Sequence, residues 1–193
     1  TWNTRCGIAA YAGYLACRLP RERLTVLASR STERLGADAD NVVRCWDAGW
    51  HDDLAGLERG IRDSGAAAAV IQFNFGLFDL QAFGRLLRRL HAEGVRTYVI
   101  LHATADVDKP DARMSLSEIP DALAGCTRLL VHGIADLNRL KALGHVDNVA
   151  LFPHGVVRAP KVDPAAVRAQ RGLGDGPILA SFGFLLPHKG HRE

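Results

Sequence analysis

The sequence contains no long hydrophobic segment and no closely spaced cysteines. No apolar run approaches the ~18 residues that a membrane-spanning helix needs, and residues 1–5 are followed by no apolar region of the kind found in secretion signals. The four cysteines, at positions 6, 17, 45 and 126, include no Cys-x-x-Cys pair, which argues against a zinc site and against a disulfide scaffold. We therefore expect reduced thiols in a cytoplasmic protein, with at least three of them buried as small apolar residues.

Several motifs that define enzyme classes are also absent. There is no His-Glu-x-x-His, no Gly-x-Ser-x-Gly, no Walker lysine loop and no Gly-x-Gly-x-x-Gly after a strand. The glycine-rich segment 172–176 precedes an apolar run and leads into Pro177, so it cannot open a helix, and we interpret it as a turn. These absences argue against a zinc protease, an α/β-hydrolase and a P-loop enzyme.

Charge is nearly balanced along most of the chain. The net charge is +3, and from Arg158 onward there are six basic and three acidic residues, so the first 157 residues are neutral overall. A weak basic bias near the C-terminal end suits an anionic ligand and is too small to indicate nucleic-acid binding.

Apolar segments typical of strands alternate with amphipathic segments typical of helices through residue 156. The expected strands are 24–28, 42–46, 66–73, 96–101, 128–131 and 149–152. The expected helices are 8–19, one that Asp52 caps and that ends at Gly65, 80–93, 117–124, and one that ends at Leu143. Residues 105–114 are predicted to be a polar loop. This alternation predicts an α/β fold with a doubly wound parallel sheet.

The chain is expected to hold one domain and the beginning of another. Residues 1–156 form the first domain, and 157–176 form a linker with a short helix over 164–171. Residues 177–193 would begin a second α/β domain, with a buried strand over 178–182, a turn at Gly183 and a loop that carries Lys189. A lysine in a glycine turn after a strand suits an anionic oxygen, most often a phosphate.

Polar residues follow several of the predicted strands, where ligands of open parallel sheets bind. Gly7 opens the first helix, Asn74 and Phe75 follow the strand at 66–73, His102 follows the strand at 96–101, and His154 follows the last strand. Each has a plainer interpretation. The Gly7 loop would be a simple turn, Asn74 would satisfy backbone groups, the histidines would be structural, and Lys189 would be a solvated surface lysine.

The arginines at 85, 88 and 89 also have both a plain and a functional interpretation. They are expected on the wet face of the helix over 80–93, and a contact with anionic lipid head groups is the functional alternative.

Five segments in order resemble the retaining glycosyltransferases of family 4, which have the GT-B fold. The segment 1–11 resembles the glycine loop and first helix of that family's N-terminal domain, and 70–78 is similar to its acceptor-side strand and loop. Residues 99–102 resemble the strand that ends in its active-site histidine, 148–156 its Pro-His-Gly turn, and 181–190 the first strand and lysine loop of its donor domain.

The resemblance implies a Rossmann-like, acceptor-side domain of a metal-independent transferase without a cofactor. Such an enzyme moves a sugar from a nucleotide-diphosphate donor to a hydroxyl of a polysaccharide or lipid-linked glycan, with retention. His102 would contact the sugar, and Lys189 with Gly7 and Gly183 would hold the donor diphosphate. Asn74 and Phe75 would shape the acceptor side, and the enzyme would be cytoplasmic, with peripheral contact to the inner face of the membrane as an option.

Two departures from the family pattern limit this implication. Phe184 stands where many members have an arginine, and most of the donor domain, with its paired-glutamate region, is missing. This polypeptide alone is therefore not expected to catalyse transfer. Two alternatives stay open: a nucleotide-sugar 2-epimerase of GT-B fold, and a non-catalytic binding module.

Overall fold

The computed structural model describes residues 1–30, 33–109, 112–156, 158 and 160–180. The chain divides into two compact units, Thr1–His154 and Gly155–Glu193. The helices of the first unit are α1 (Gly7–Ala16), α2 (Ala55–Asp63), α3 (Leu80–Ala92), α4 (Pro120–Ala124) and α5 (Ile134–Ala142), with 3₁₀ helices at Arg21–Arg23 and Leu116–Glu118. Its strands are β1 (Val26–Ser29), β2 (Val42–Trp46), β3 (Ala68–Phe73), β4 (Arg96–Leu101), β5 (Val107–Lys109), β6 (Ala112–Met114), β7 (Arg128–Val131) and β8 (Val149–Leu151).

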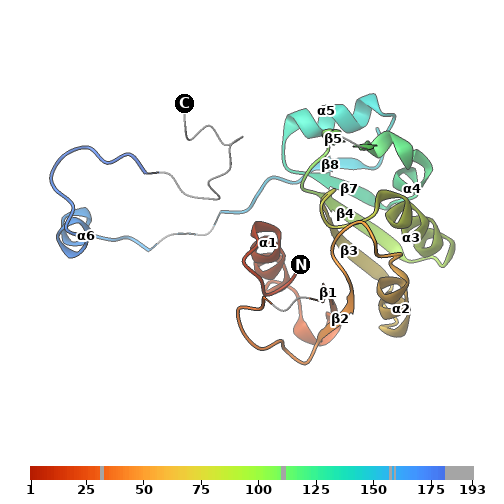
Figure 1. Ribbon diagram of the computed structural model, residues 1–193, viewed down its shortest axis with the longest axis horizontal. Coiled ribbons are helices and arrows are strands. Elements are labelled where there is room, and N and C mark those ends of the chain that lie inside the picture. The colour runs from red at the N-terminus through yellow and green to blue at the C-terminus, as the bar shows by residue number, and fades with distance from the viewer. Residues whose placement is uncertain (31–32, 110–111, 157, 159, 181–193) are drawn as a thin grey trace. The chain divides into compact units, whose positions relative to one another are not determined.

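The centre of the first unit is a four-stranded sheet in the order β3-β4-β7-β8, and every pairing in it is parallel. Strands β1 and β2 pair with each other, also in parallel, as a separate two-stranded sheet. The expected α/β class and parallel sheet are therefore confirmed. The sheet flanked by helices has the arrangement of a Rossmann-like α/β fold (Figure 1).

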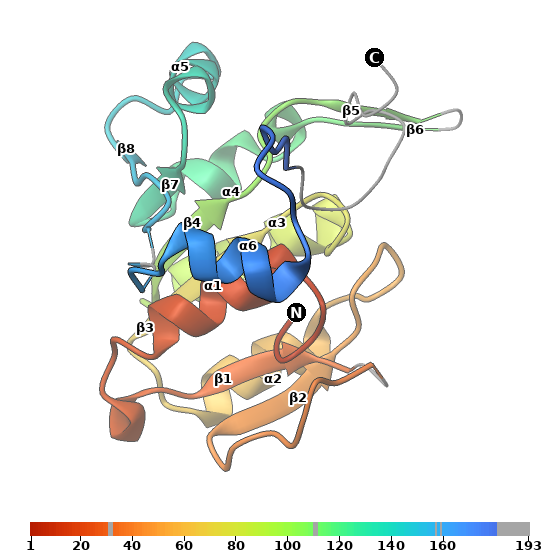
Figure 2. The ribbon, with the colours of Figure 1, turned by 90° about the vertical axis from the view of Figure 1, so that its left-hand side faces the viewer.

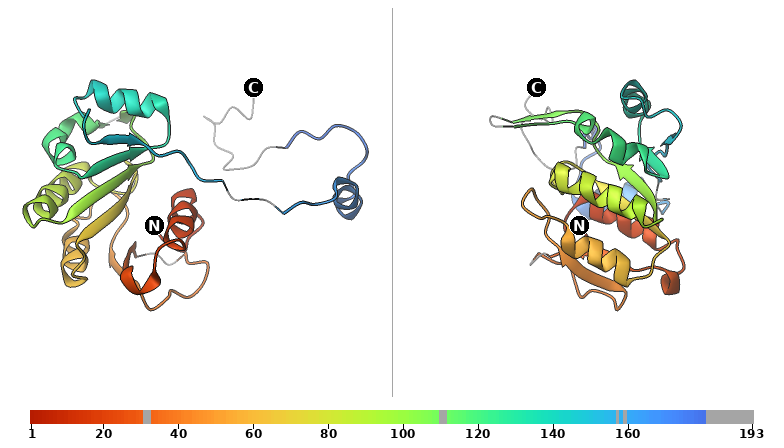
Figure 3. Two further views of the ribbon diagram at one scale, coloured as in Figure 1. Left: turned by 180° about the vertical axis from the view of Figure 1, so that it is seen from behind. Right: turned by 90° about the vertical axis from the view of Figure 1, so that its right-hand side faces the viewer.

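Helices cover the central sheet on both faces. On one side, α3 packs on β4 of the central sheet and α2 packs on β1 and β2, whereas α1 lies on the opposite side (Figures 2 and 3). The sequence makes α3 a good covering helix, because Asp79 caps it by accepting a hydrogen bond from the N–H of Ala82 and its apolar residues recur on one side. The core that it closes contains large side chains with almost no exposed surface, among them Phe73, Phe83, Leu87, Leu101, Leu123 and Leu129.

One expectation about local structure is wrong, and another finds no support in the part of it that the structure describes. The predicted polar loop at 105–114 contains an antiparallel hairpin, in which Val107 pairs with Met114. The strand expected over 178–182 is absent from its described part, where residues 178–180 have no regular structure and Leu179 is fully exposed. A single strand without paired neighbours is not stable. No strand lies among the described residues of the second unit. The predicted short helix is confirmed as α6 (Pro164–Arg171), with Asp163 as its cap.

The four cysteines agree with the expectation of free thiols but not with the expectation that at least three are buried. All four thiols are free, as expected, but only Cys126 is buried, while Cys6 and Cys45 are half-buried and Cys17 is exposed. Arg85, Arg88 and Arg89 are exposed on α3, and Arg89 pairs with Glu58 of α2. Among the described residues, no helix combines the length and apolar character needed to cross a membrane.

Candidate functional site

Three histidines gather where the parallel strands of the central sheet end. His102 directly follows β4, His132 directly follows β7, and His154 comes three residues after β8. Because parallel strands place their carboxyl ends at one edge, the three imidazoles meet. The ring centroids of His102 and His132 are 4.9 Å apart, and those of His132 and His154 are stacked at 3.7 Å. We call these residues, with Tyr11 and Gln72, the histidine cluster.

Tyr11 joins the cluster from the opposite side. Its ring comes from α1 and meets all three imidazoles edge-on, with centroid distances of 5.2 Å to His102, 5.2 Å to His132 and 5.3 Å to His154. Edge-to-face contacts of this kind are a favoured aromatic geometry. The tyrosine therefore connects the first helix of the chain to the ends of three strands.

A chain of hydrogen bonds fixes two of the imidazoles. Nε2 of His102 lies 2.7 Å from Oε1 of Gln72, the penultimate residue of β3. Nδ1 of His102 lies 3.3 Å from Nε2 of His132, and Nδ1 of His132 lies 2.8 Å from the carbonyl oxygen of Phe152. Both nitrogens of both rings are thus engaged, so these two rings are held in place.

The environment disfavours the charged forms of His102, His154 and Tyr11. Burial, with the neighbouring His132 and His154, lowers the pKa of His102 from 6.5 to about 4. Burial, followed by His132, lowers the pKa of His154, and burial raises the pKa of Tyr11. Around pH 7, His102 is therefore neutral and Tyr11 keeps its hydroxyl proton.

The cluster leaves some polar atoms available to a ligand. His154 is exposed and Tyr11 is half-buried, and no hydrogen bond to a described residue uses the Tyr11 hydroxyl or the ring nitrogens of His154. A surface with aromatic rings and a few unused polar groups suits a small molecule that carries both hydroxyls and apolar faces. His102 has no such free atom, because Gln72 and His132 occupy both of its nitrogens.

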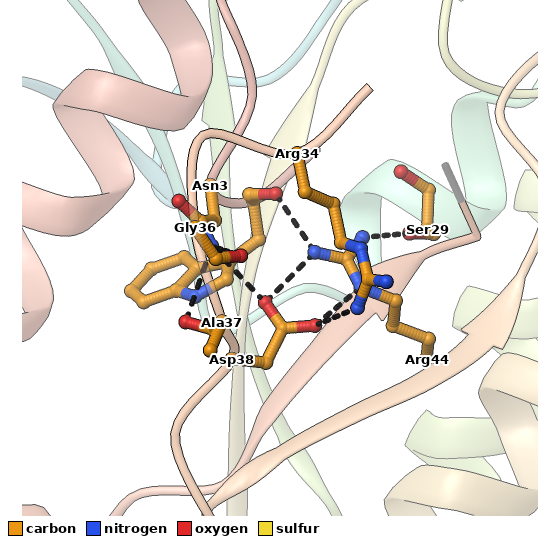
Figure 4. A network of polar contacts seen from close by, with 8 residues as sticks. Asn3, Ser29, Arg34, Gly36, Ala37, Asp38 and Arg44 are labelled. Atoms are coloured by element: carbon orange, nitrogen blue, oxygen red, sulfur yellow. Dashed lines mark hydrogen bonds and ion pairs between the residues drawn. The ribbon is translucent and has the colours of Figure 1, made fainter. Parts of the chain in front are cut away.

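The loop that leads into α1 is anchored by an ion pair (Figure 4). Arg44 of β2 binds both carboxylate oxygens of Asp38, at 2.7 and 2.9 Å, and also donates to the carbonyl oxygens of Trp2 and Ser29. The hydrogen bonds from Arg44 hold the pKa of Asp38 at about 2. The side chain of Asn3 donates to the backbone of the same loop at Gly36. These bonds hold residues 2–3 beside the carboxyl end of β1.

A second anchor holds the loop that follows β4. The buried Thr104 accepts a hydrogen bond from Nη1 of Arg139 at 2.6 Å, and its hydroxyl lies 2.5 Å from Oδ1 of Asp136. Both partners belong to α5, so this network ties the segment after His102 to the helix after His132.

The residues predicted for the site lie in different surroundings in the structure. His102 and the expected helix start at Gly7 both lie in the described fold, and a side chain added at Gly7 would contact nothing within 4 Å, so this helix start is open. Asn74 closes a local turn by accepting from the N–H of Gly76 at 2.9 Å. Phe75 is buried against Phe73, so its side chain faces the core and not an acceptor. Its backbone oxygen instead accepts from Trp50 at 2.7 Å.

The remaining predicted residues, Gly183 and Lys189, lie outside the described residues. In the described part of the chain, no group of three or more His, Cys, Asp or Glu side chains is placed to hold a metal ion. The sequence interpretation missed His132 and Tyr11. His132 carries the same signal as His102, a histidine directly after a parallel strand, whereas Tyr11 becomes visible only when α1 is placed on the sheet.

Comparison with known proteins gives no relative for this chain: no family model, no curated protein and no solved structure matches it.

Proposed function

We propose that this chain is the acceptor-side part of a glycosyltransferase. The enzyme would move a sugar from a nucleotide-diphosphate donor to a hydroxyl of a polysaccharide or lipid-linked glycan, with retention. The observation that carries the proposal is the histidine cluster, because it gathers three imidazoles and one phenol at the carboxyl edge of a parallel sheet, where open α/β sheets bind their ligands.

The cluster suits a sugar because its available groups are uncharged hydrogen-bonding groups beside aromatic rings. In this proposal the Tyr11 hydroxyl and the His154 imidazole bind sugar hydroxyls. His102 acts indirectly: it shares a hydrogen bond with His132, on which the His154 ring is stacked. The role inferred for His102 from the sequence, direct contact with the sugar, would require the ring to exchange one of its two present partners.

The donor diphosphate needs positive charge, whereas burial disfavours the charged forms of His102 and His154. Breaking the bond to the sugar builds negative charge on the leaving diphosphate, and a fixed cation lowers the energy of that step. The sequence offers Lys189 for this task, and the positive end of the α1 helix dipole would add to it. Because these groups can neutralise phosphate, the proposal requires no metal.

A matched set of variants in the full-length protein tests the proposal. Nucleotide sugars are first screened by thermal shift, since a ligand that binds only the folded state raises the melting temperature. With a donor found, Tyr11→Phe and His154→Ala should each lower the rate of transfer at least about tenfold, which corresponds to about 1.4 kcal/mol of transition-state stabilisation. His145→Gln, a change at a buried histidine outside the cluster, serves as the control and should leave the relative rate near that of the wild type.

The products separate this proposal from its rivals. A retaining transferase forms a glycoside of unchanged anomeric configuration only when an acceptor is present, whereas an epimerase converts its sugar nucleotide without an acceptor. If no nucleotide sugar shifts the melting temperature of the full-length protein and none is consumed, the proposal is wrong.

A further inference from the structure

A cavity of about 630 Å³, lined mainly by apolar residues and partly open to solvent, lies in the first unit. Helix α1 contributes Leu15 to its wall, β1 contributes Leu27, α2 contributes Leu57 and β3 contributes Val70. Well-packed protein interiors contain few voids larger than a water molecule. A void of this size, bounded by two strands and by helices from both faces of the sheet, has the place and the surroundings of a missing element of secondary structure.

Two unpaired strand edges face this cavity. Strand β1 pairs only with β2 and β3 pairs only with β4 in the part of the chain that the structure describes. Val26–Leu27 of β1 and residues 68–72 of β3 line the cavity, so the unused edges of both strands point into it. An unpaired strand edge presents a row of free backbone N–H and C=O groups, which is a template for pairing with a further strand.

The two edges have the same direction. Strands β1 and β2 are parallel. The loop after β2 bonds to the loop after β3, through the N–H of Gly49 to the carbonyl oxygen of Leu77 at 3.0 Å, so the carboxyl ends of β2 and β3 lie at one edge. A strand inserted between β1 and β3 can therefore pair in parallel with both.

Helix α1 and strand β3, which both line the cavity, are incompletely buried. Helix α1 contains no charged residue, yet Ala9 is its only buried residue. Val70, in the middle of β3, has 51% of its surface exposed. Apolar residues of a parallel strand and of its covering helix are normally buried. One more strand beneath α1 would cover both.

The start of the described chain lies at the correct end of the cavity. Thr1 and Trp2 line it, and Arg44 links the carbonyl oxygen of Trp2 to that of Ser29, the last residue of β1. Residue 2 therefore lies at the carboxyl edge, where a strand parallel to β1 and β3 would end before turning into α1.

We propose that the apolar cavity holds a further parallel β-strand, supplied by the residues directly N-terminal to Thr1 in the full-length polypeptide. This strand joins the two sheets into one, in the order β2-β1-new strand-β3-β4-β7-β8. It is apolar, because helices cover both of its faces, and about five or six residues long, the usual strand length. Its carboxyl end lies where the strand order reverses, beside Tyr11 and Gln72 of the histidine cluster.

The upstream reading frame gives the first test. The codons that precede Thr1 should encode an apolar run of about five or six residues, ending within two or three residues of Thr1. An upstream sequence that is polar or charged throughout, or a start codon directly before Thr1, would overturn the proposal.

Stability and hydrogen exchange give the second test, with three matched chains. The chain that carries its natural upstream residues should melt at least about 4 °C above the chain that starts at Thr1, and amides of β1 and β3 should exchange at least about tenfold more slowly. A third chain, in which Ser-Lys-Ser-Lys-Ser replaces the upstream run, should behave like the chain that starts at Thr1. Equal melting temperatures and equal exchange in all three chains would contradict the proposal.

The oligomeric state distinguishes the upstream strand from the competing occupant of the cavity, a strand of a second copy of this chain. If the chain that starts at Thr1 dimerises and protects β1 and β3 as strongly as the longer chain does, the cavity belongs to a strand of a second copy and the proposal is wrong. If it stays monomeric with both edges unprotected, the occupant is the upstream segment. None of these readouts depends on sugar transfer, so the proposed function and this inference fail separately.

Discussion

His102 and His132 share a hydrogen bond between Nδ1 of the first ring and Nε2 of the second, at 3.3 Å. The remaining nitrogens each face an oxygen, on Gln72 and on the backbone at Phe152. Two neutral rings carry two N–H groups, whereas three contacts require three donors. The amide of Gln72 can supply the third donor by presenting its NH₂ group, and an added proton on the pair can also supply it.

The first prediction concerns acid stability. The pKa of His102 is about 4 in the folded protein and 6.5 ordinarily, so between these values the unfolded chain binds a proton that the folded chain does not. The free energy of unfolding should therefore be greatest above pH 6.5 and fall as the pH drops toward 4. Urea unfolding at several pH values measures this slope.

His102→Gln should make that slope shallower without abolishing it, because the pKa values of His145 and His154 are also lowered. Parallel pH profiles for the wild type and the variant would show that His102 does not titrate as described.

The second prediction concerns Gln72. Replacing its amide by a carboxylate, Gln72→Glu, puts a negative charge about where Oε1 now lies, 2.7 Å from His102. A carboxylate at hydrogen-bonding distance favours the charged imidazole and should raise the pKa of His102 by at least about one unit. Titration of the imidazole resonances by NMR measures the shift. Gln72→Met, which adds no charge, is the control, and an equal shift in both variants would rule out the electrostatic cause.

The third prediction concerns the packing of α2 on β2. A methyl group at Gly56 would lie 2.0 Å from the carbonyl oxygen of Cys45, a backbone atom that cannot turn aside. Gly56→Ala should therefore lower the free energy of unfolding by about 1–3 kcal/mol. Gly13→Ala is the matched control, because Gly13 also lies inside a helix but has nothing within 4 Å, and it should stabilise by about 0.5–1 kcal/mol. Equal effects would mean that α2 does not approach β2 so closely.

The fourth prediction concerns thiol reactivity. Burial opposes ionisation of Cys6, but the N–H of Ala9, the Thr1 hydroxyl and the N–H of Ile8 outweigh it and lower the pKa of this thiol. Burial raises the pKa of Cys126 to about 11. Iodoacetamide should modify Cys6 at least tenfold faster than Cys126 at pH 7.5, as measured by peptide mapping. In urea the two rates should converge, and a difference that persists there would have another cause.

Much of the fold could be predicted from sequence periodicity. Strands 42–46, 96–101 and 128–131 have the predicted bounds, because each is a short, mostly apolar segment bounded by polar residues. The hairpin at 107–114 could not be found in this way, since its two strands have only three residues each, too few to show a periodic pattern.

The site was predictable only in part, because its geometry depends on tertiary packing. The rule that polar residues after parallel strands converge applies to His102, His132 and His154 alike. No local pattern in α1 shows that Tyr11 reaches three rings on other elements, and none shows that Phe75 turns inward. Both facts follow from the way α1 and the loop after β3 pack on the sheet.

The most direct test of the account is a titration of the full-length protein with the nucleotide sugar found by thermal shift, followed through the imidazole resonances by NMR. The signals of His132 and His154 should move as the ligand binds, and that of His102 should follow through its hydrogen bond, while the signal of His145 stays unchanged. Saturable binding that leaves all three cluster signals unmoved would place the ligand elsewhere and contradict the account.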